Sequence, residues 1–184
     1  MTAPVHYSYY TPAGPITIEA RGADVTRIVL GQAALAGAHE PNAATNQAAT
    51  QLQEYLARRR RAFTFAFATC GSAFQNQVWT ALAQVPYGKT VTAARLAEMI
   101  GHAGAHRAVG AAVRANPLAI VVPAHRLVRA GGQPGGEGKP ARIRGALLAF
   151  EQAAEAAGEG AGNANDCSTA NADAGTHDAN ASKE

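Results

Sequence analysis

The sequence predicts a small α/β N-terminal domain, a mainly α-helical C-terminal domain with a helix-turn-helix, and a disordered acidic tail. Three observations predict this. Short segments of alternating apolar residues open the chain, as in strands, and apolar residues at three- and four-residue spacing follow from residue 72, as in helices. After Phe150 the chain has no large apolar residue. The expected boundaries are 1–70 and 71–155, with the tail over 156–184.

The N-terminal domain should begin with three strands around proline- and glycine-containing turns: Val5–Tyr10, Ile16–Ala20 and Val25–Leu30. Residues 31–46 are rich in Ala and Asn, which favours a surface loop. Gln47–Arg61 carries an apolar helical stripe, and Phe63, Phe65 and Phe67 then alternate as in a strand. The arginines Arg58–Arg61 either contact a phosphate backbone or, the interpretation we favour, form a solvated helix end.

The C-terminal domain should be built from four helices: Ser72–Ala83, Thr92–Ile100, Ala105–Arg114 and Arg142–Ala154. Asn116-Pro117 ends the third helix, because the residue before a proline avoids helical geometry. Leu118–Pro123 is expected to be a short strand or extended run, and residues 129–140 a Gly/Pro-rich loop. Beyond about residue 156, the chain buries too little apolar area to offset its entropy.

Charge and composition restrict the classes of function. Residues 1–151 carry +8, from 15 basic against seven acidic side chains, whereas residues 152–184 carry −5. A basic body favours an anionic partner, with nucleic acid first. No apolar run approaches the roughly 20 residues of a membrane span, and no secretory signal opens the chain, so we expect a cytoplasmic protein without membrane contact. Cys70 and Cys167 are too few for a disulfide framework.

Two common catalytic signatures are absent. Gly138-Lys139 resembles the end of a P-loop, but Gln133 stands at the position of the first glycine and Pro140 replaces the hydroxyl residue. The six histidines show no metal-binding spacing, so no metal is expected. His125 follows an apolar run and is either a general base or an ordinary packed histidine, since its neighbour Ala124 is no nucleophile.

The helices on either side of Gly101 resemble a helix-turn-helix, although plain helix packing gives the same pattern. The exposed side of the second helix offers Gly110 and other small residues, with Arg107 and Arg114. Small residues allow a backbone to approach a groove wall, and arginines reach phosphates or insert among bases.

The chain resembles the O6-alkylguanine-DNA alkyltransferases over about residues 5–152. The resemblance is carried by GSAFQNQVWTALAQVPYGKTVTAARLAEMIG, HRAVGAAVRANPLAIVVPAHRLV and LLAFE, and more weakly by TPAGPITI and QLQEYLARRRRAFTF. It implies a ribonuclease H-like N-terminal domain and a C-terminal domain that binds duplex DNA through the minor groove. An alkylated guanine would be flipped into a pocket. It also implies a monomer that needs no cofactor.

The resemblance assigns roles to individual residues. Arg107 would fill the gap left by the flipped base. Asn116 would link the second helix of the pair, which is the recognition helix, to the segment that carries the active-site motif. His125 would depress the pKa of an acceptor thiol through a water, and Glu151 would orient that histidine. Further DNA contacts would come from Thr92, Gly110, Arg114 and Arg126, and pocket contacts from Pro123 and Trp79.

Three departures separate this chain from the family pattern. The family motif reads Pro-Cys-His-Arg, whereas Ala124 stands at the position of the acceptor cysteine, and a methyl group cannot accept an alkyl group. Ala93 replaces a tyrosine that helps to rotate the phosphate. The loop before the last helix has Glu137 where an aromatic ring is expected, and Pro140 removes a backbone donor. Neither Cys70 nor Cys167 has a neighbouring histidine to make it a substitute acceptor.

Three hypotheses follow. The first, which we favour, is an alkyltransferase-like protein that recognises O6-alkylguanine without transfer and recruits nucleotide excision repair proteins. The second is an alkyltransferase inactivated by loss or deliberate replacement of the cysteine at Ala124. The third is a DNA-binding relic without lesion preference, which uses only the helix pair and its basic charge.

Overall fold

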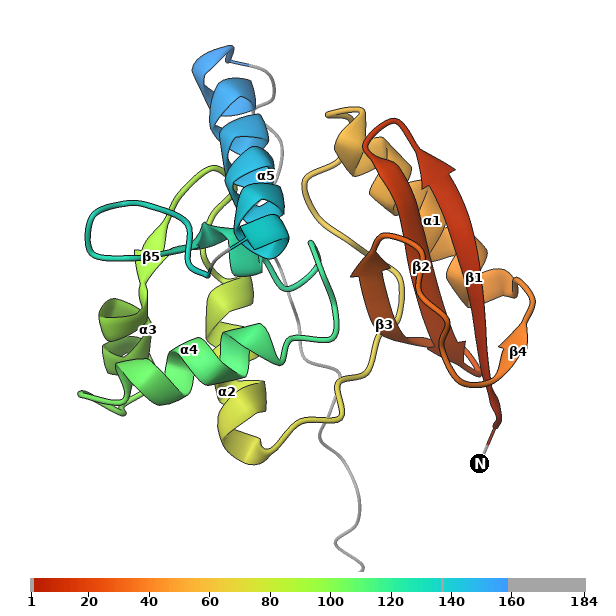
Figure 1. Ribbon diagram of the computed structural model, residues 1–184, viewed down its shortest axis with the longest axis horizontal. Helices are drawn as coiled ribbons and strands as arrows, with labels where there is room; N and C mark the ends of the chain where they lie inside the picture. The colour runs from red at the N-terminus through yellow and green to blue at the C-terminus, as the bar shows by residue number, and fades with distance from the viewer. Residues whose placement is uncertain (1, 137, 159–184) are drawn as a thin grey trace, which may run out of the picture.

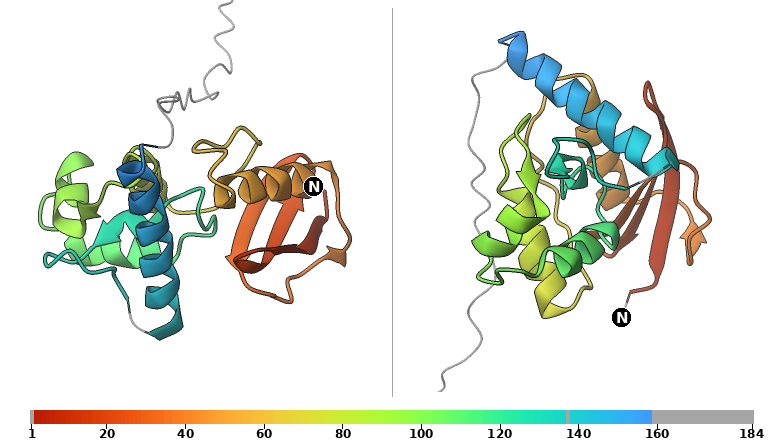
Figure 2. Two further views of the ribbon diagram at one scale, coloured as in Figure 1. Left: turned by 90° about the horizontal axis from the view of Figure 1, so that it is seen from above. Right: turned by 60° about the vertical axis from the view of Figure 1, so that its left-hand side comes forward.

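The computed structural model describes residues 2–136 and 138–158. Its first part is a four-stranded sheet in the order β3-β2-β1-β4, with one helix across it (Figures 1 and 2). Strands β1, β2 and β3 pair antiparallel, and β4 pairs parallel to β1. The elements are β1 (Pro4–Thr11), β2 (Gly14–Arg21), β3 (Asp24–Leu30), β4 (Ala38–His39) and α1 (Ala43–Leu56).

Helix α1 covers one face of this sheet because both surfaces are apolar there. Ala48 and Leu52 on the helix and Ile18 on β2 are all fully buried. The helix starts with a capping box, in which Asn42 and Thr45 each satisfy the other's backbone amide. This cap places the start of α1 within the region expected to be a loop.

Two details of the N-terminal prediction are wrong. Helix α1 ends at Leu56 and not at Arg61, because the chain turns at Arg58, which has a left-handed φ of +60°. The phenylalanines after it form no strand, although Phe67 makes one isolated parallel bridge to Val25. Phe65 is buried in the core, so the alternation reflects burial of an extended segment rather than pairing along its length.

The second part consists of helices around two very short strands. Its elements are α2 (Ala73–Ala83), β5 (Val91–Thr92), α3 (Ala93–Met99), α4 (His106–Arg114), the 3₁₀ turn η1 (Ala124–Arg126), β6 (Leu127–Val128) and α5 (Gly138–Ala156). The prediction of an α/β part followed by a helical part is therefore confirmed. The fourth expected helix starts four residues earlier than predicted, because its first turn takes in the end of the glycine-rich loop.

The expected strand over residues 118–123 is a turn, with Val122 N–H donating to the Leu118 carbonyl at 3.0 Å. Its only ladder contact among the described residues is a bridge between Leu118 and Ile28 of β3. The Ile28 amide donates to Pro117 at 2.8 Å, and the Ala119 amide donates to Ile28 at 3.3 Å. This bridge covers part of the open edge of β3 and joins the two parts of the molecule.

Within residues 2–136 and 138–158, no helix is both long and apolar enough to cross a membrane. The same residues hold no group of three or more His, Cys, Asp or Glu side chains that could bind a metal ion. The expected disorder of the acidic tail lies outside the described residues, except for its first three positions. Of those, Ala156 is the last residue of α5.

Candidate functional site

The turn after α4 is held by one side chain. Asn116 Nδ2 donates to the Val122 carbonyl at 2.8 Å, and Asn116 Oδ1 accepts from the Leu118 amide at 2.9 Å. Between these contacts Ile120 has φ +71°, which is strained for a β-branched residue. Asn116 and the bridge to β3 hold the strained backbone, and this turn sets the position of η1.

Ala124, the first residue of η1, borders a cavity of about 520 Å³. The cavity lies between β3, the end of α4, the Asn116 turn and the first half of α5, and His125 also borders it. A second cavity of about 490 Å³ reaches Ala93 at the start of α3 and shares Arg114 and Arg144 with the first.

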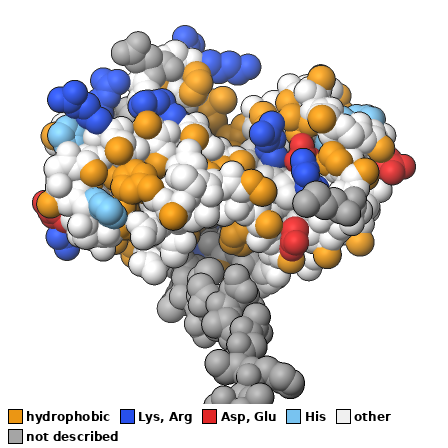
Figure 3. Space-filling view, turned by 90° about the horizontal axis from the view of Figure 1, so that it is seen from below, with side chains coloured by type: hydrophobic (Ala, Val, Ile, Leu, Met, Phe, Trp, Pro, Cys, Tyr) orange, Lys and Arg blue, Asp and Glu red, His pale blue; other side chains and the backbone are white. Residues whose placement is uncertain are grey.

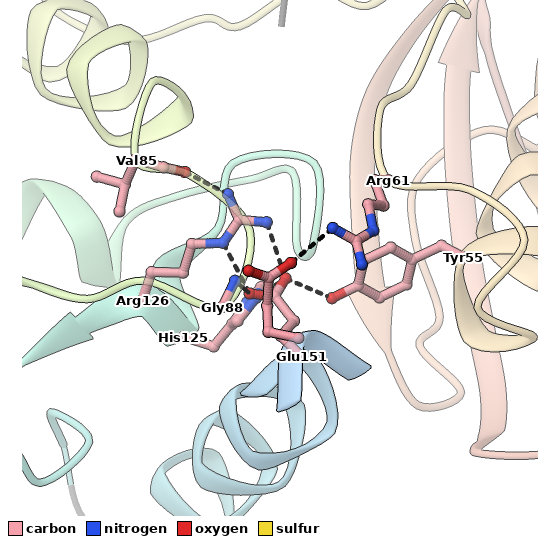
Figure 4. Close-up of polar contacts among 8 residues, drawn as sticks. Tyr55, Arg61, Val85, Gly88, His125, Arg126 and Glu151 are labelled. Atoms are coloured by element: carbon pink, nitrogen blue, oxygen red, sulfur yellow. Dashed lines mark hydrogen bonds and ion pairs between the residues drawn. The ribbon is translucent and has the colours of Figure 1, made fainter. Parts of the chain in front are cut away.

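His125 and Arg126 enter a buried cluster around Glu151, which has no solvent exposure (Figure 4). Arg126 makes a bidentate pair with the carboxylate, Nε to Oε2 at 2.9 Å and Nη2 to Oε1 at 2.8 Å. His125 Nε2 lies 2.9 Å from Oε1, and the Gly88 amide donates to Oε2 at 2.9 Å. The third Arg126 donor, Nη1, bonds the Val85 carbonyl.

The electrostatics of this cluster favour an ionised carboxylate. Burial alone would raise the pKa of the Glu151 carboxyl, but hydrogen bonds from His125 and Arg126 and the charges on both side chains hold it well below its ordinary value. A carboxylate fixed in this way accepts the Nε2 proton of His125. This contact orients the ring, with Nε2 toward Glu151 and Nδ1 away from it.

The N-terminal part supplies one member of the cluster. Tyr55 of α1 is 1% exposed, and its hydroxyl donates to Glu151 Oε1 at 2.7 Å. Burial and the nearby Glu151 charge raise the pKa of the Tyr55 phenol, so it stays a donor. The carboxylate that positions His125 is thus held from both parts of the molecule.

Two of the four arginines after α1 contact the C-terminal part. Arg61 pairs with Glu155 of α5 at 2.6 Å, and its guanidinium lies 4.7 Å from the centre of the Tyr87 ring. Arg58 lies 5.0 Å from the centre of the Phe150 ring. The interpretation that we favoured from the sequence is therefore incomplete: Arg58 is exposed but also covers Phe150, and Arg61 is half-buried against Glu155 and Tyr87.

Helix α4 has the composition of a surface that can approach a polyanion. Val109, Ala112 and Val113 are buried against α2 and α3, whereas Arg107 and Arg114 are exposed and Gly110 is half-buried. Lys and Arg side chains gather along one edge of the helical part in Figure 3. The described geometry thus combines a basic helical surface with a cavity that ends at Ala124.

The sequence of this chain is similar to those of known proteins. A family model described as 6-O-methylguanine DNA methyltransferase, DNA binding domain, matches residues 73–153. A methylated-DNA–protein-cysteine methyltransferase of Mycobacterium leprae is 36% identical over 150 residues, which cover 77% of this chain and 88% of the relative. The chain belongs to the methylated-DNA–protein-cysteine methyltransferase family.

Solved structures agree with this membership. The crystal structure of Mycobacterium tuberculosis O6-methylguanine methyltransferase matches with a TM-score of 0.75 at 33% identity, over 82% of this chain and 93% of that one. A structure of the Mycobacterium tuberculosis protein in complex with DNA matches with a TM-score of 0.74 at 35% identity, over 81% and 93%. The fold is therefore that of the methyltransferase family across both parts of the chain.

The structure brings together Ala124, His125 and Glu151, to which the resemblance assigns the reaction. It offers no thiol beside them within the described residues. Cys70 is exposed and borders neither cavity, and Cys167 lies outside the described residues. The name of the family specifies a cysteine. In this chain, however, Ala124 at the cavity wall has only a methyl side chain.

Three of the predicted site residues have a different role. Arg126 was expected to contact DNA, but it is 5% exposed and its donors are bound by Glu151 and Val85. Trp79 was expected in the pocket, but it is buried between α2 and α4 with its Nε1 donating to the Ala112 carbonyl at 2.9 Å. Pro123 is also buried and does not border the cavity beside Ala124.

Of the remaining predicted residues, Gly110, Arg114 and Asn116 border a cavity, whereas Thr92 and Arg107 border neither. Thr92 caps α3 by accepting from the Arg95 amide at 3.2 Å, and its strand β5 pairs parallel with β6, directly after Arg126. In the altered loop, Glu137 lies outside the described residues, whereas Lys139 and Pro140 lie in the first turn of α5 and border the cavity.

Sequence reasoning missed two functional contributions. Tyr55 was recognised only as part of an apolar stripe, although a buried tyrosine hydroxyl usually needs a partner. Its partner Glu151 is 96 positions away, so no local pattern could name it. Arg144 borders both cavities, but within the expected helix Arg142–Ala154 it resembled an ordinary surface residue.

Proposed function

We propose that this chain is a DNA-binding, alkyltransferase-like protein that recognises O6-alkylguanine in duplex DNA without accepting the alkyl group. The observation that carries the proposal is Ala124 at the cavity wall, beside an intact His125–Glu151 pair. A saturated methyl side chain has no lone pair with which to attack an alkyl carbon. The protein therefore binds the lesion without repairing it. The bound complex would mark the damaged base for nucleotide excision repair proteins.

The basic surface supports the DNA-binding half of the proposal. We infer that α3 and α4 act as a helix-turn-helix with α4 against the DNA groove, where the half-buried Gly110 permits close approach. Arg107, exposed near the start of α4, would enter the stack in place of the flipped guanine. The flipped base would occupy the cavities, with its O6 substituent directed toward Ala124.

A titration with matched duplexes tests the proposal. Fluorescence anisotropy would compare a duplex carrying one O6-methylguanine with the same duplex carrying guanine, at one salt concentration. We expect tighter binding of the lesion duplex, and intact-protein mass spectrometry after long incubation should show no added methyl group. Equal affinities for both duplexes would favour a DNA-binding relic without lesion preference and would overturn the proposal.

The variant Ala124→Cys separates this proposal from an alkyltransferase that lacks only its acceptor. We expect the variant to bind the lesion duplex as the natural chain does and to transfer no methyl group. The reason is that Ala93 replaces the tyrosine of the family pattern and Lys139 and Pro140 alter the cavity wall. A methylated variant, detected by mass spectrometry, would instead support simple loss or replacement of the cysteine.

A further inference from the structure

Two histidines meet at the β4 edge of the N-terminal sheet, which lies away from the helical part (Figure 1). His6 of β1 and His39 of β4 are cross-strand partners, so their side chains leave the sheet on the same face. Their ring centres are 5.2 Å apart, with an angle of 70° between the ring planes. Gly37, at φ +103°, lets β4 approach β1 this closely, because a Cβ there would collide with the Pro4 carbonyl.

The inner histidine of this pair has a nitrogen without a partner. His6 is only 6% exposed, whereas His39 is exposed. The Nδ1 atom of His6 is buried and makes no hydrogen bond, and no other buried side-chain nitrogen or oxygen of the described residues is in this state. Edge-to-face packing of the two rings accounts for the angle between them but leaves this nitrogen unsatisfied, which is costly in a buried position. The nitrogen is therefore available to a ligand.

The spacing of the rings fits one metal ion between them. Imidazole nitrogen binds Zn²⁺ at about 2.0–2.1 Å, which places the ring centres of two imidazoles on one tetrahedral ion roughly 5 Å apart. Glu19 of β2 is the partner of His6 on its other side and adds negative charge on the same face. Its Oε1 accepts from the Thr26 hydroxyl at 2.7 Å, so Glu19 is a charged neighbour rather than a ligand.

We propose that His6 and His39 form a binding site for Zn²⁺ or a similar divalent transition-metal ion, with His6 Nδ1 and one ring nitrogen of His39 as the protein ligands. Imidazole suits Zn²⁺, Ni²⁺ and Cu²⁺, whereas Mg²⁺ and Ca²⁺ prefer oxygen. The described part of the chain brings no third His, Cys, Asp or Glu ligand to the pair, so waters complete the coordination shell.

Such an ion would link β4 to β1, at a distance in the fold from the cavity beside Ala124. The spacing of the histidines along the chain predicted no metal. His6 and His39 are far apart in the sequence, and only the pairing of β1 with β4 brings them together.

Titration of zinc chloride into the full chain without DNA, followed by isothermal titration calorimetry, tests this proposal. We expect zinc binding that His39→Gln and His6→Gln each weaken by at least about tenfold, because each substitution removes one of two protein ligands. His39 is exposed, so its substitution should leave folding intact even where that of the buried His6 does not. Circular dichroism of both variants checks this.

Two control variants remove other exposed groups that could bind zinc. They are His102→Gln, in the turn before α4, and Cys70→Ser. Both should bind zinc at the site with the affinity of the natural chain. Saturating zinc should also raise the urea midpoint of the natural chain and of both controls, but not that of His39→Gln, because only a site formed in the folded state adds stability.

The outcomes decide whether the ion lies at this pair. No zinc binding by the natural chain would overturn the proposal, as would equal affinities of the natural chain and His39→Gln. Loss of binding in His102→Gln or Cys70→Ser, with full affinity in His39→Gln, would place the ion elsewhere and overturn it too. Lesion binding is measured separately on DNA duplexes, so the failure of either proposal leaves the other standing.

Discussion

Glu151 determines whether the residues around Ala124 hold their positions. Its two oxygens accept from Tyr55, Gly88 and Arg126 and contact His125, so every direction around the carboxylate has a partner. Such a cluster is costly to break, because removal of one member leaves a buried charge or dipole unsatisfied. Through its contact with His125, the cluster fixes a residue of the cavity wall beside Ala124.

Tyr55→Phe tests the contribution of the N-terminal part to this cluster. The substitution removes one hydrogen bond to a buried charged acceptor and should lower the free energy of unfolding by about 1.5–3 kcal/mol. Urea denaturation measures this. Tyr10→Phe is the control, because Tyr10 is 73% exposed, and its change should stay within about 0.5 kcal/mol. Equal effects of the two substitutions would contradict the role of the Tyr55 hydroxyl.

The lowered pKa of Glu151 predicts a pH dependence of stability. The unfolded carboxyl takes up a proton near its ordinary pKa of 4.5, whereas the folded one stays ionised to lower pH. The stabilisation is therefore complete above the unfolded value and is lost as pH falls toward the folded value. Between about pH 5 and pH 3, the unfolding free energy of the natural chain should fall more steeply than that of Glu151→Gln.

The same pair of proteins provides a check at neutral pH. Glu151→Gln should be less stable by about 3–5 kcal/mol at pH 7, because Arg126 is left buried without its counter-charge. Urea denaturation at a series of pH values should show the two curves converging in acid. Parallel curves would mean that Glu151 does not titrate as its surroundings indicate.

At the scale of single residues, the sequence could identify the chemistry but not all of the contacts. Ala124, His125 and Glu151 were found because a motif fixes their types and order. Arg126 was assigned to DNA through the resemblance, within a basic body that favours an anionic partner. Its burial depends on Glu151 and Val85, which are 25 and 41 positions away, and no local pattern contains that information.

At the scale of elements, local signals worked where they were complete. The starts of α2 and α3 follow from Ser72 and Thr92, which cap these helices at their N-terminal ends. The three long strands follow from the alternation of apolar residues and from the turns between them. The predicted strand over Phe63–Phe67 failed because pairing depends on a partner edge, which β3 offers only at Val25. The start of α5 was missed because the glycine and proline content of its first turn indicates a loop.

Helix α4 carries the prediction that separates lesion reading from simple charge attraction. Arg107→Ala should weaken binding of the O6-methylguanine duplex by about tenfold and binding of the undamaged duplex much less. The reason is that only a flipped base leaves a gap for the side chain to fill. Arg21→Ala, at the exposed end of β2, is the control and should affect neither. Equal weakening of both duplexes would make Arg107 a phosphate contact.

At the scale of the whole molecule, the two parts are coupled where the site is built. The bridge between Ile28 and Leu118 supports the turn before Ala124, and Tyr55 and Arg61 contact α5. The β3 side chain of Arg27 also borders the cavity. The N-terminal part therefore contributes to the shape and charge of the pocket, which composition and periodicity could not indicate.

The asymmetry of charge gives the last prediction. Because α5 extends to Ala156, a deletion of residues 159–184 leaves it intact while removing five acids and one base. We expect these carboxylates to compete with DNA for the basic surface in the full chain. The shortened chain should bind undamaged duplex more tightly at low salt and equally at high salt, where screening removes the competition. Anisotropy titrations over a range of salt concentrations measure this, and unchanged affinity at low salt would show that the acidic segment does not compete.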